Sequence, residues 1–103
     1  MTGDPATVAV STALAETVAA ERLRIVAGLI GRTGDWELAE DAMQDAAASA
    51  LTAWVRTGIP RNPAAWLTTA AQNAAIDGLR RASTRQAAAR RAAVEAAGGF
   101  DQA

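Results

Sequence analysis

The chain has 103 residues, half of them hydrophobic, and its 11 acidic and 10 basic residues leave a formal net charge of −1. Cys and His are both absent, which excludes disulfides, most zinc sites and two of the side chains most used in catalysis. No apolar run reaches the roughly twenty residues of a membrane span, and no basic residue precedes Arg22, so a signal peptide is not indicated. We therefore expect one soluble, cytoplasmic domain without a metal or cofactor.

The hydrophobic content consists mostly of small side chains. Ala occurs 29 times, whereas the chain has one Phe, three Trp and no Tyr. Ala has the highest helix propensity and allows helices to approach closely, while strands would need the β-branched and aromatic residues that are scarce here. The composition predicts an all-α fold, and with the elements expected along the chain we predict a compact bundle of three to four helices.

The N-terminal third should contain one or two helices. We expect Met1–Gly3 to be loose and residues 1–15 to form a partly helical segment, which Asp4 and Pro5 would start as N-cap and first-turn residue. The helical domain proper is predicted over residues 16–82. Its first helix, residues 16–32, carries an apolar stripe made of Leu23, Val26, Ala27 and Ile30.

A central helix is predicted to begin after Gly34 and to form a tight antiparallel hairpin with the preceding one. Asp35 is a typical N-cap, and Glu37 lies in the first turn, where the helix dipole favours negative charge. Apolar residues then recur at three- and four-residue spacing, which indicates a buried stripe. The stripe comprises Leu38, Ala39, Ala42, Met43, Ala46, Ala50 and Trp54.

The opposite side of this helix is acidic. Between Gly34 and Trp54 there are five acidic residues and no basic one. Like charges four residues apart cost a helix a few tenths of a kcal/mol for each pair. The face formed by Glu40, Asp41, Gln44 and Asp45 therefore indicates a basic partner, with a simply solvated face as the alternative reading.

The last helix should follow a loop at residues 57–61, because Asn62 and Pro63 provide an N-cap and a first-turn proline. It is predicted to run to about Ala82. Its expected apolar residues are Trp66, Leu67, Ala70, Ala71, Ala74 and Ile76. Residues 83–103 should form an Ala- and Arg-rich helical extension or frayed tail that ends at Gly98–Gly99.

Basic residues gather in the second half of the chain. Residues 56–91 contain seven Arg against Asp77 alone, a net charge of +6. Such a cluster attracts phosphate or acidic surfaces. Asp77 is expected to pair with Arg80 or Arg81, and the arginines beyond Ser83 are read either as a solubilising tail or as phosphate contacts.

Two motifs in this order resemble a known family. Residues 39–46, Ala-Glu-Asp-Ala-Met-Gln-Asp-Ala, are similar to a helix in region two of bacterial ECF (extracytoplasmic-function) sigma factors. Residues 65–81 are similar to the Trp-Leu-x-x-Ile-Ala-Arg-Asn-x-Ala-x-Asp-x-Leu-Arg-Arg helix of that family. The resemblance covers residues 17–81 and implies a non-enzymatic sigma-factor domain that binds RNA polymerase core and recognises the promoter minus-ten element.

The resemblance also implies roles for single residues. Asp41, Gln44 and Asp45 match positions that contact the clamp coiled coil of the polymerase, and we add Glu40 of the same acidic face. On the DNA side, the loop 57–62 matches one that receives a flipped-out base of the non-template strand. The predicted DNA-binding residues are Arg61, Asn62, Trp66, Asn73, Arg80 and Arg81. Arginine neutralises phosphate, amides read base edges, and Trp66 can either stack on a base or pack in the core.

Two departures from the family pattern leave alternatives open. Gln72 stands where Arg is usual, so one phosphate contact is expected to be missing. The family's second helical domain, which reads the minus-thirty-five element, is not expected within these residues. We therefore expect an excised domain or a natural truncation. The alternative function is a stand-alone helical module that binds polymerase or an anti-sigma factor without initiating transcription.

Overall fold

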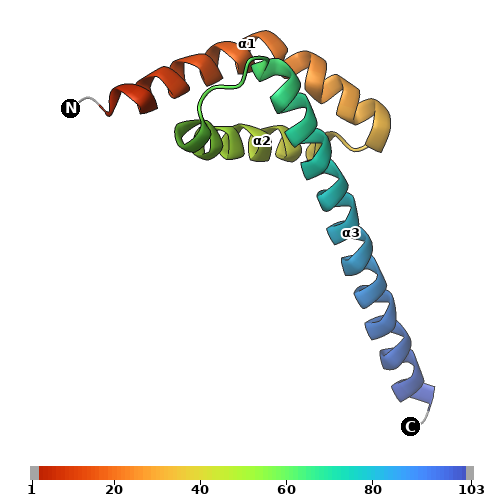
Figure 1. Ribbon diagram of the computed structural model, residues 1–103. Coiled ribbons are helices and arrows are strands. Elements are labelled where there is room, and N and C mark those ends of the chain that lie inside the picture. The colour runs from red at the N-terminus through yellow and green to blue at the C-terminus, as the bar shows by residue number, and fades with distance from the viewer. Residues whose placement is uncertain (1–2, 102–103) are drawn as a thin grey trace.

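The computed structural model describes residues 3–101, and side chains up to Gly98. It contains the helices α1 (Pro5–Thr33), α2 (Trp36–Thr57) and α3 (Pro63–Asp101), joined by two short connections (Figure 1). No strand occurs within the described residues, and the predicted all-α fold is confirmed. The expectation of a loose N-terminus falls mainly on Met1 and Thr2, which lie outside this range.

Helix α1 is one continuous element. It begins at Pro5, and Asp4 occupies the N-cap position without a side-chain capping hydrogen bond. Val10 and Leu14 of its first half are buried with the residues of its second half. The N-terminal segment that the sequence suggested as partly separate therefore belongs to the same helix and contributes to the core. No Pro or Gly interrupts the chain between Ala6 and Ala27, which explains the continuity.

The turn between α1 and α2 satisfies the backbone at both helix ends. Gly34 has a left-handed φ of 69°, and its amide donates to the Ile30 carbonyl at 2.8 Å. Oδ1 of Asp35 then accepts a hydrogen bond from the Leu38 amide at 3.0 Å. As a result, α1 and α2 run antiparallel, as predicted (Figure 1).

The core lies where α2 packs between α1 and the first half of α3. The predicted stripe of α2 is buried except for Leu38, which is half-buried against it. Most of these side chains are alanines, which let the helix axes approach closely. Larger apolar side chains fill the remaining space; the largest fully buried ones are Trp54, Met43 and Leu67.

Three predicted core positions are wrong, because Leu23 and Ala27 of α1 and Ile76 of α3 are exposed. Leu23 is 84% exposed, and Ile25 and Leu29 are buried in its half of α1. In α3, Ile76 is 46% exposed while its neighbour Ala75 is buried. In α1 the buried face is rotated by about one residue from the predicted stripe, whereas in α3 Leu67 and Ala71 are buried as predicted and the difference is at Ile76. The many alanines make the apolar stripes too wide to define their direction from the sequence.

Beyond Ala82, α3 leaves the helical body and projects away from it (Figure 1). All described side chains from Ser83 to Gly98 are exposed, so helix propensity rather than burial maintains this extension. The helix continues through Gly98 to Asp101 instead of ending at the glycine pair. Despite the length of α1 and α3, no helix within the described residues has an apolar stretch that could cross a membrane.

Candidate functional site

Helix α2 presents the predicted acidic face, with one change. Asp41, Gln44 and Asp45 are exposed to solvent. Glu40, by contrast, forms an ion pair with Arg22 of α1 and is only partly exposed. The exposed acidic row is therefore narrower than the sequence indicated, because α1 neutralises one of its members.

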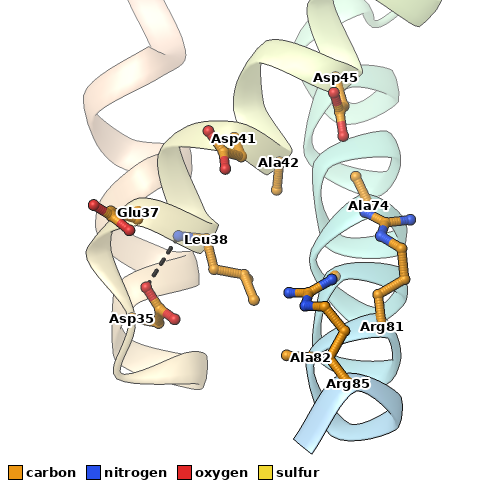
Figure 2. Close-up of a pocket in the computed structure, with 11 residues that line it drawn as sticks. Asp35, Glu37, Leu38, Asp41, Ala42, Asp45, Ala74, Arg81, Ala82 and Arg85 are labelled. Carbon is orange, nitrogen blue, oxygen red and sulfur yellow. Dashed lines mark hydrogen bonds between the residues drawn. The ribbon is translucent and has the colours of Figure 1, made fainter. Parts of the chain in front are cut away.

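Across a groove from this row lie arginines of α3. The groove, of about 300 Å³, is lined on the α2 side by Asp41 and Asp45 and on the α3 side by Arg81 and Arg85. Figure 2 shows the guanidinium groups of α3 opposite the carboxylates of α2. Within the described residues no ion pair closes this groove. Positive and negative walls thus face each other, and both remain accessible to a partner.

The loop between α2 and α3 is positioned by its two ends. Gly58 takes a φ of 96°, and its amide donates to the Trp54 carbonyl at 2.9 Å. At the other end, Oδ1 of Asn62 accepts a hydrogen bond from the Ala65 amide at 3.0 Å. The amide oxygen of Asn62 is thus used as a helix cap, while its NH₂ group remains available as a donor.

Three of the predicted DNA-binding residues line one open hollow. Asn62, Trp66 and Asn73 border it together with four smaller or apolar residues, which are Pro60, Ala65, Thr69 and Ala70. The hollow is about 510 Å³ in size and mostly apolar at its floor. It combines an aromatic surface with two amide groups, the chemistry that a single unstacked base needs.

The remaining predicted DNA-binding residues lie around this hollow rather than in it. Arg61 and Arg80 are exposed and line neither this hollow nor the groove between the acidic row and α3. Asn73 and Arg80 are seven residues apart, about two turns, and so share one face of α3. Arg81 is turned towards α2, where it lines a second groove with Asp45, Asn73 and Asp77.

Trp66, which lines the hollow, forms an edge-to-face pair with Trp54. Their ring centroids are 5.5 Å apart at an interplanar angle of 77°. Trp54 is 1% exposed, and its Nε1 has no hydrogen-bond partner among the described residues. Trp66 is half-buried, so one side of its ring packs on Trp54 while the residue also lines the hollow. Both readings of Trp66 from the sequence are therefore compatible.

The ion pairs and one apolar groove of the structure differ from what the sequence predicted. The predicted pairing of Asp77 with Arg80 or Arg81 is not found in the described part of the chain. Among the described residues, Glu40 pairs with Arg22 and Glu21 pairs with Arg24. An apolar groove between α1 and α2 is lined by Leu23 and Trp36, whose side chains are largely exposed. The sequence indicated the Arg22–Glu40 ion pair only in that a basic and an acidic residue lie on either side of the predicted hairpin turn.

Comparison with curated proteins finds an uncharacterised protein of Rhizobium meliloti (strain 1021), which is 53% identical over 47 residues. That match covers 46% of this chain and 11% of the relative, so the chain spans only a small part of that protein's length. No solved structure matches the sequence significantly.

A family comparison covers most of the helical body. The family described as sigma-70 region 2 matches residues 14–85, from the first half of α1 to the point where α3 leaves the body. This family is a non-enzymatic transcription-initiation domain that binds RNA polymerase core and promoter DNA. Since the match includes the acidic face of α2, the loop and the arginine-bearing part of α3, the chain belongs to the sigma-70 region 2 family.

Proposed function

We propose that this chain is the region-two domain of an ECF-type sigma factor, acting in the cytoplasm. It would bind RNA polymerase core through α2 and engage the non-template strand of the minus-ten element through α3 and its preceding loop. The observation that carries this proposal is the hollow that unites Asn62, Trp66 and Asn73. These residues come from a loop and from two further turns of α3, and only the folded chain makes them one site.

The polymerase contact is assigned to Asp41, Gln44 and Asp45. These side chains are exposed on one face of α2, and no basic residue occurs in that helix before Arg56. Such a face favours a basic helical partner, and the clamp coiled coil implied by the family resemblance is our candidate. Glu40 is retained as a residue that positions α2 against α1 through Arg22.

The DNA contact divides into recognition and attraction. Asn62 and Asn73 offer amide donors beside Trp66, which suits the edges and face of a flipped-out base. Arg61 and Arg80 are exposed nearby and supply sequence-independent attraction to phosphate. The contribution of Arg81 is weaker, because it shares a groove with Asp45. We assign the domain to residues 16–82 and regard residues 83–103 as an appended Ala- and Arg-rich tail.

Reversal of two charges tests the polymerase contact. Asp41→Arg combined with Asp45→Arg should abolish most of the binding to core polymerase, because the acidic row becomes basic. A matched control is Glu16→Arg with Glu95→Arg, which changes net charge equally at exposed positions outside the row. Binding is measured with immobilised core polymerase, and circular dichroism verifies helicity. Equal binding by the two double variants would overturn the assignment and favour a stand-alone module, with an anti-sigma factor as the next partner to test.

A further inference from the structure

A notch between α1 and α3 contains a second group of basic and polar side chains. Arg24, Gly28 and Arg32 follow at four-residue intervals and therefore share one face of α1. Thr68 and Gln72, one turn apart on α3, form the opposite wall. The notch is about 90 Å³ in size and lies on the side of α3 away from the acidic row of α2, because Gln72 and Arg81 are two and a half turns apart.

Gly28 lines the notch and adds no side chain to it. A Cβ atom placed at this position would meet no other heavy atom within 4 Å, so the space above it is unfilled. A glycine inside a helix costs stability of roughly 0.5–1 kcal/mol relative to alanine. Packing against α3 therefore does not require a glycine here, and an alanine methyl group would take up space at a position that lines the notch between Arg24 and Arg32.

The two arginines of the notch differ in how they are held. Arg24 donates through Nε and Nη2 to Oε1 of Glu21, at 2.9 and 2.7 Å, and through Nη2 to the Thr68 hydroxyl at 3.1 Å. Its charge is thereby offset and its guanidinium fixed across the notch. Arg32 is exposed and has no acidic partner within the described part of the chain. The notch thus keeps a net charge of +1 beside the Gln72 amide.

We propose that this notch binds one phosphate of the single DNA strand that the hollow engages, and the proposal therefore rests on the DNA half of the proposed function. Arg32 would supply the charge, Arg24 and the Gln72 amide further donors, and Gly28 the room for close approach. Gln72 precedes Asn73 directly and is turned about 100° from it around the axis of α3, so the notch and the hollow lie on adjacent sides of one helical turn. The cation expected at position 72 from the family pattern is then provided by α1 instead.

Opposite charge changes at Gln72 provide the first test. Gln72→Arg should tighten binding of a fluorescent minus-ten-like single strand, and Gln72→Glu should weaken it several-fold, as measured by anisotropy at several salt concentrations. The matched controls are Gln86→Arg and Gln86→Glu on the exposed extension of the same helix. A purely long-range charge effect would change the DNA affinity equally for substitutions at either position. A phosphate in the notch makes the change in affinity clearly larger for substitutions at Gln72.

A second test identifies the phosphate itself. Single linkages of the same oligonucleotide are replaced in turn by uncharged methylphosphonate. Replacement of one particular linkage should weaken binding to the parent chain but should not change binding to Arg32→Gln. The slope of the logarithm of the binding constant against the logarithm of the salt concentration should be smaller in magnitude by about 0.7 for Arg32→Gln than for the parent chain. Circular dichroism tests whether Arg32→Gln is folded. If it is not, the near-isosteric Gln72→Glu provides an independent measurement.

The outcomes separate the two proposals. In one outcome, Asn73→Ala and Arg80→Ala weaken binding, but the Gln72 and Gln86 variants respond alike and no linkage depends on Arg32. The notch assignment is then overturned, and the proposed function stands. If the parent chain binds no single strand, even at low salt, both the notch and the DNA half of the proposed function are overturned. The polymerase contact is then judged by its own experiment.

Discussion

Ala50 shows how strongly a single methyl group can constrain this small core. Its side chain is fully buried in the stripe of α2. Replacement by leucine adds volume that the adjoining helices must accommodate, and such overpacking costs about 1–3 kcal/mol. Ala50→Leu should therefore lower the thermal midpoint clearly in circular dichroism melts. Ala48→Leu, at an exposed position of the same helix, is the control, and equal melting of the two variants would mean that the stripe has been misplaced.

Asn62 has two separable tasks at one side chain. Its amide oxygen caps α3, whereas its NH₂ group borders the hollow. Asn62→Ala should cost about 1 kcal/mol of stability and also weaken DNA binding, because both groups are lost. Asn62→Asp should keep the stability, since aspartate is an equally good cap, yet bind a single strand more weakly. Melting curves and anisotropy together test this, and unchanged DNA binding by Asn62→Asp would remove Asn62 from the recognition site.

At the level of single elements, two glycines three residues apart near the end of α1 should respond in opposite ways. Gly31 is inside the helix, and a Cβ there would meet nothing within 4 Å, so Gly31→Ala should stabilise the protein by up to about 1 kcal/mol. Gly34 has a φ of 69°, which strains any residue with a Cβ. Gly34→Ala should destabilise by about 1 kcal/mol. Chemical denaturation of both variants measures the difference, and a shift of the same sign would be inconsistent with a left-handed turn.

The pairing of α2 with α3 explains how an acidic row is tolerated on α2. Arg81 and Arg85 lie across the groove from Asp41 and Asp45, so the like charges along α2 are partly offset. Arginines introduced at positions 41 and 45 would instead face arginines of α3. For this reason the neutral pair Asp41→Asn and Asp45→Asn should accompany the double reversal; it should also weaken polymerase binding, with a smaller effect on stability.

At the scale of the whole molecule, the proposed DNA surface combines residues that recognise bases with residues that attract phosphate. Arg80→Ala should weaken binding to all single strands alike and reduce the salt slope, because it removes a phosphate contact. Asn73→Ala should mainly reduce the preference for a minus-ten-like strand over a scrambled one. Anisotropy with both strands, alone and with core polymerase, provides the measurement. If sequence preference survives in Asn73→Ala, this residue is an exposed helix amide without a role in recognition.

Much of the architecture followed from local chemistry that a sequence displays directly. Asp35 and Asn62 mark helix starts because their side chains accept backbone hydrogen bonds a few residues ahead. Gly34 marks a helix end because it can take a left-handed conformation. These caps, with the abundance of alanine, were sufficient for the all-α fold, the hairpin and the boundaries of α2 and of the loop. The stripe of α2 could be placed because acidic residues define its opposite side.

Only the tertiary structure decided which faces meet. Alanine stripes are wide and weakly directional, so the burial of Ile25 rather than Leu23, and of Ala75 rather than Ile76, depended on how the three helices pack. Contacts between residues far apart in the chain were equally hidden, as in the Arg22–Glu40 pair and the hollow between Asn62 and Asn73. Sequence by itself determined the elements and the segregation of charge, because both are local. The sites depend on side chains brought together across helices, and packing alone determines that.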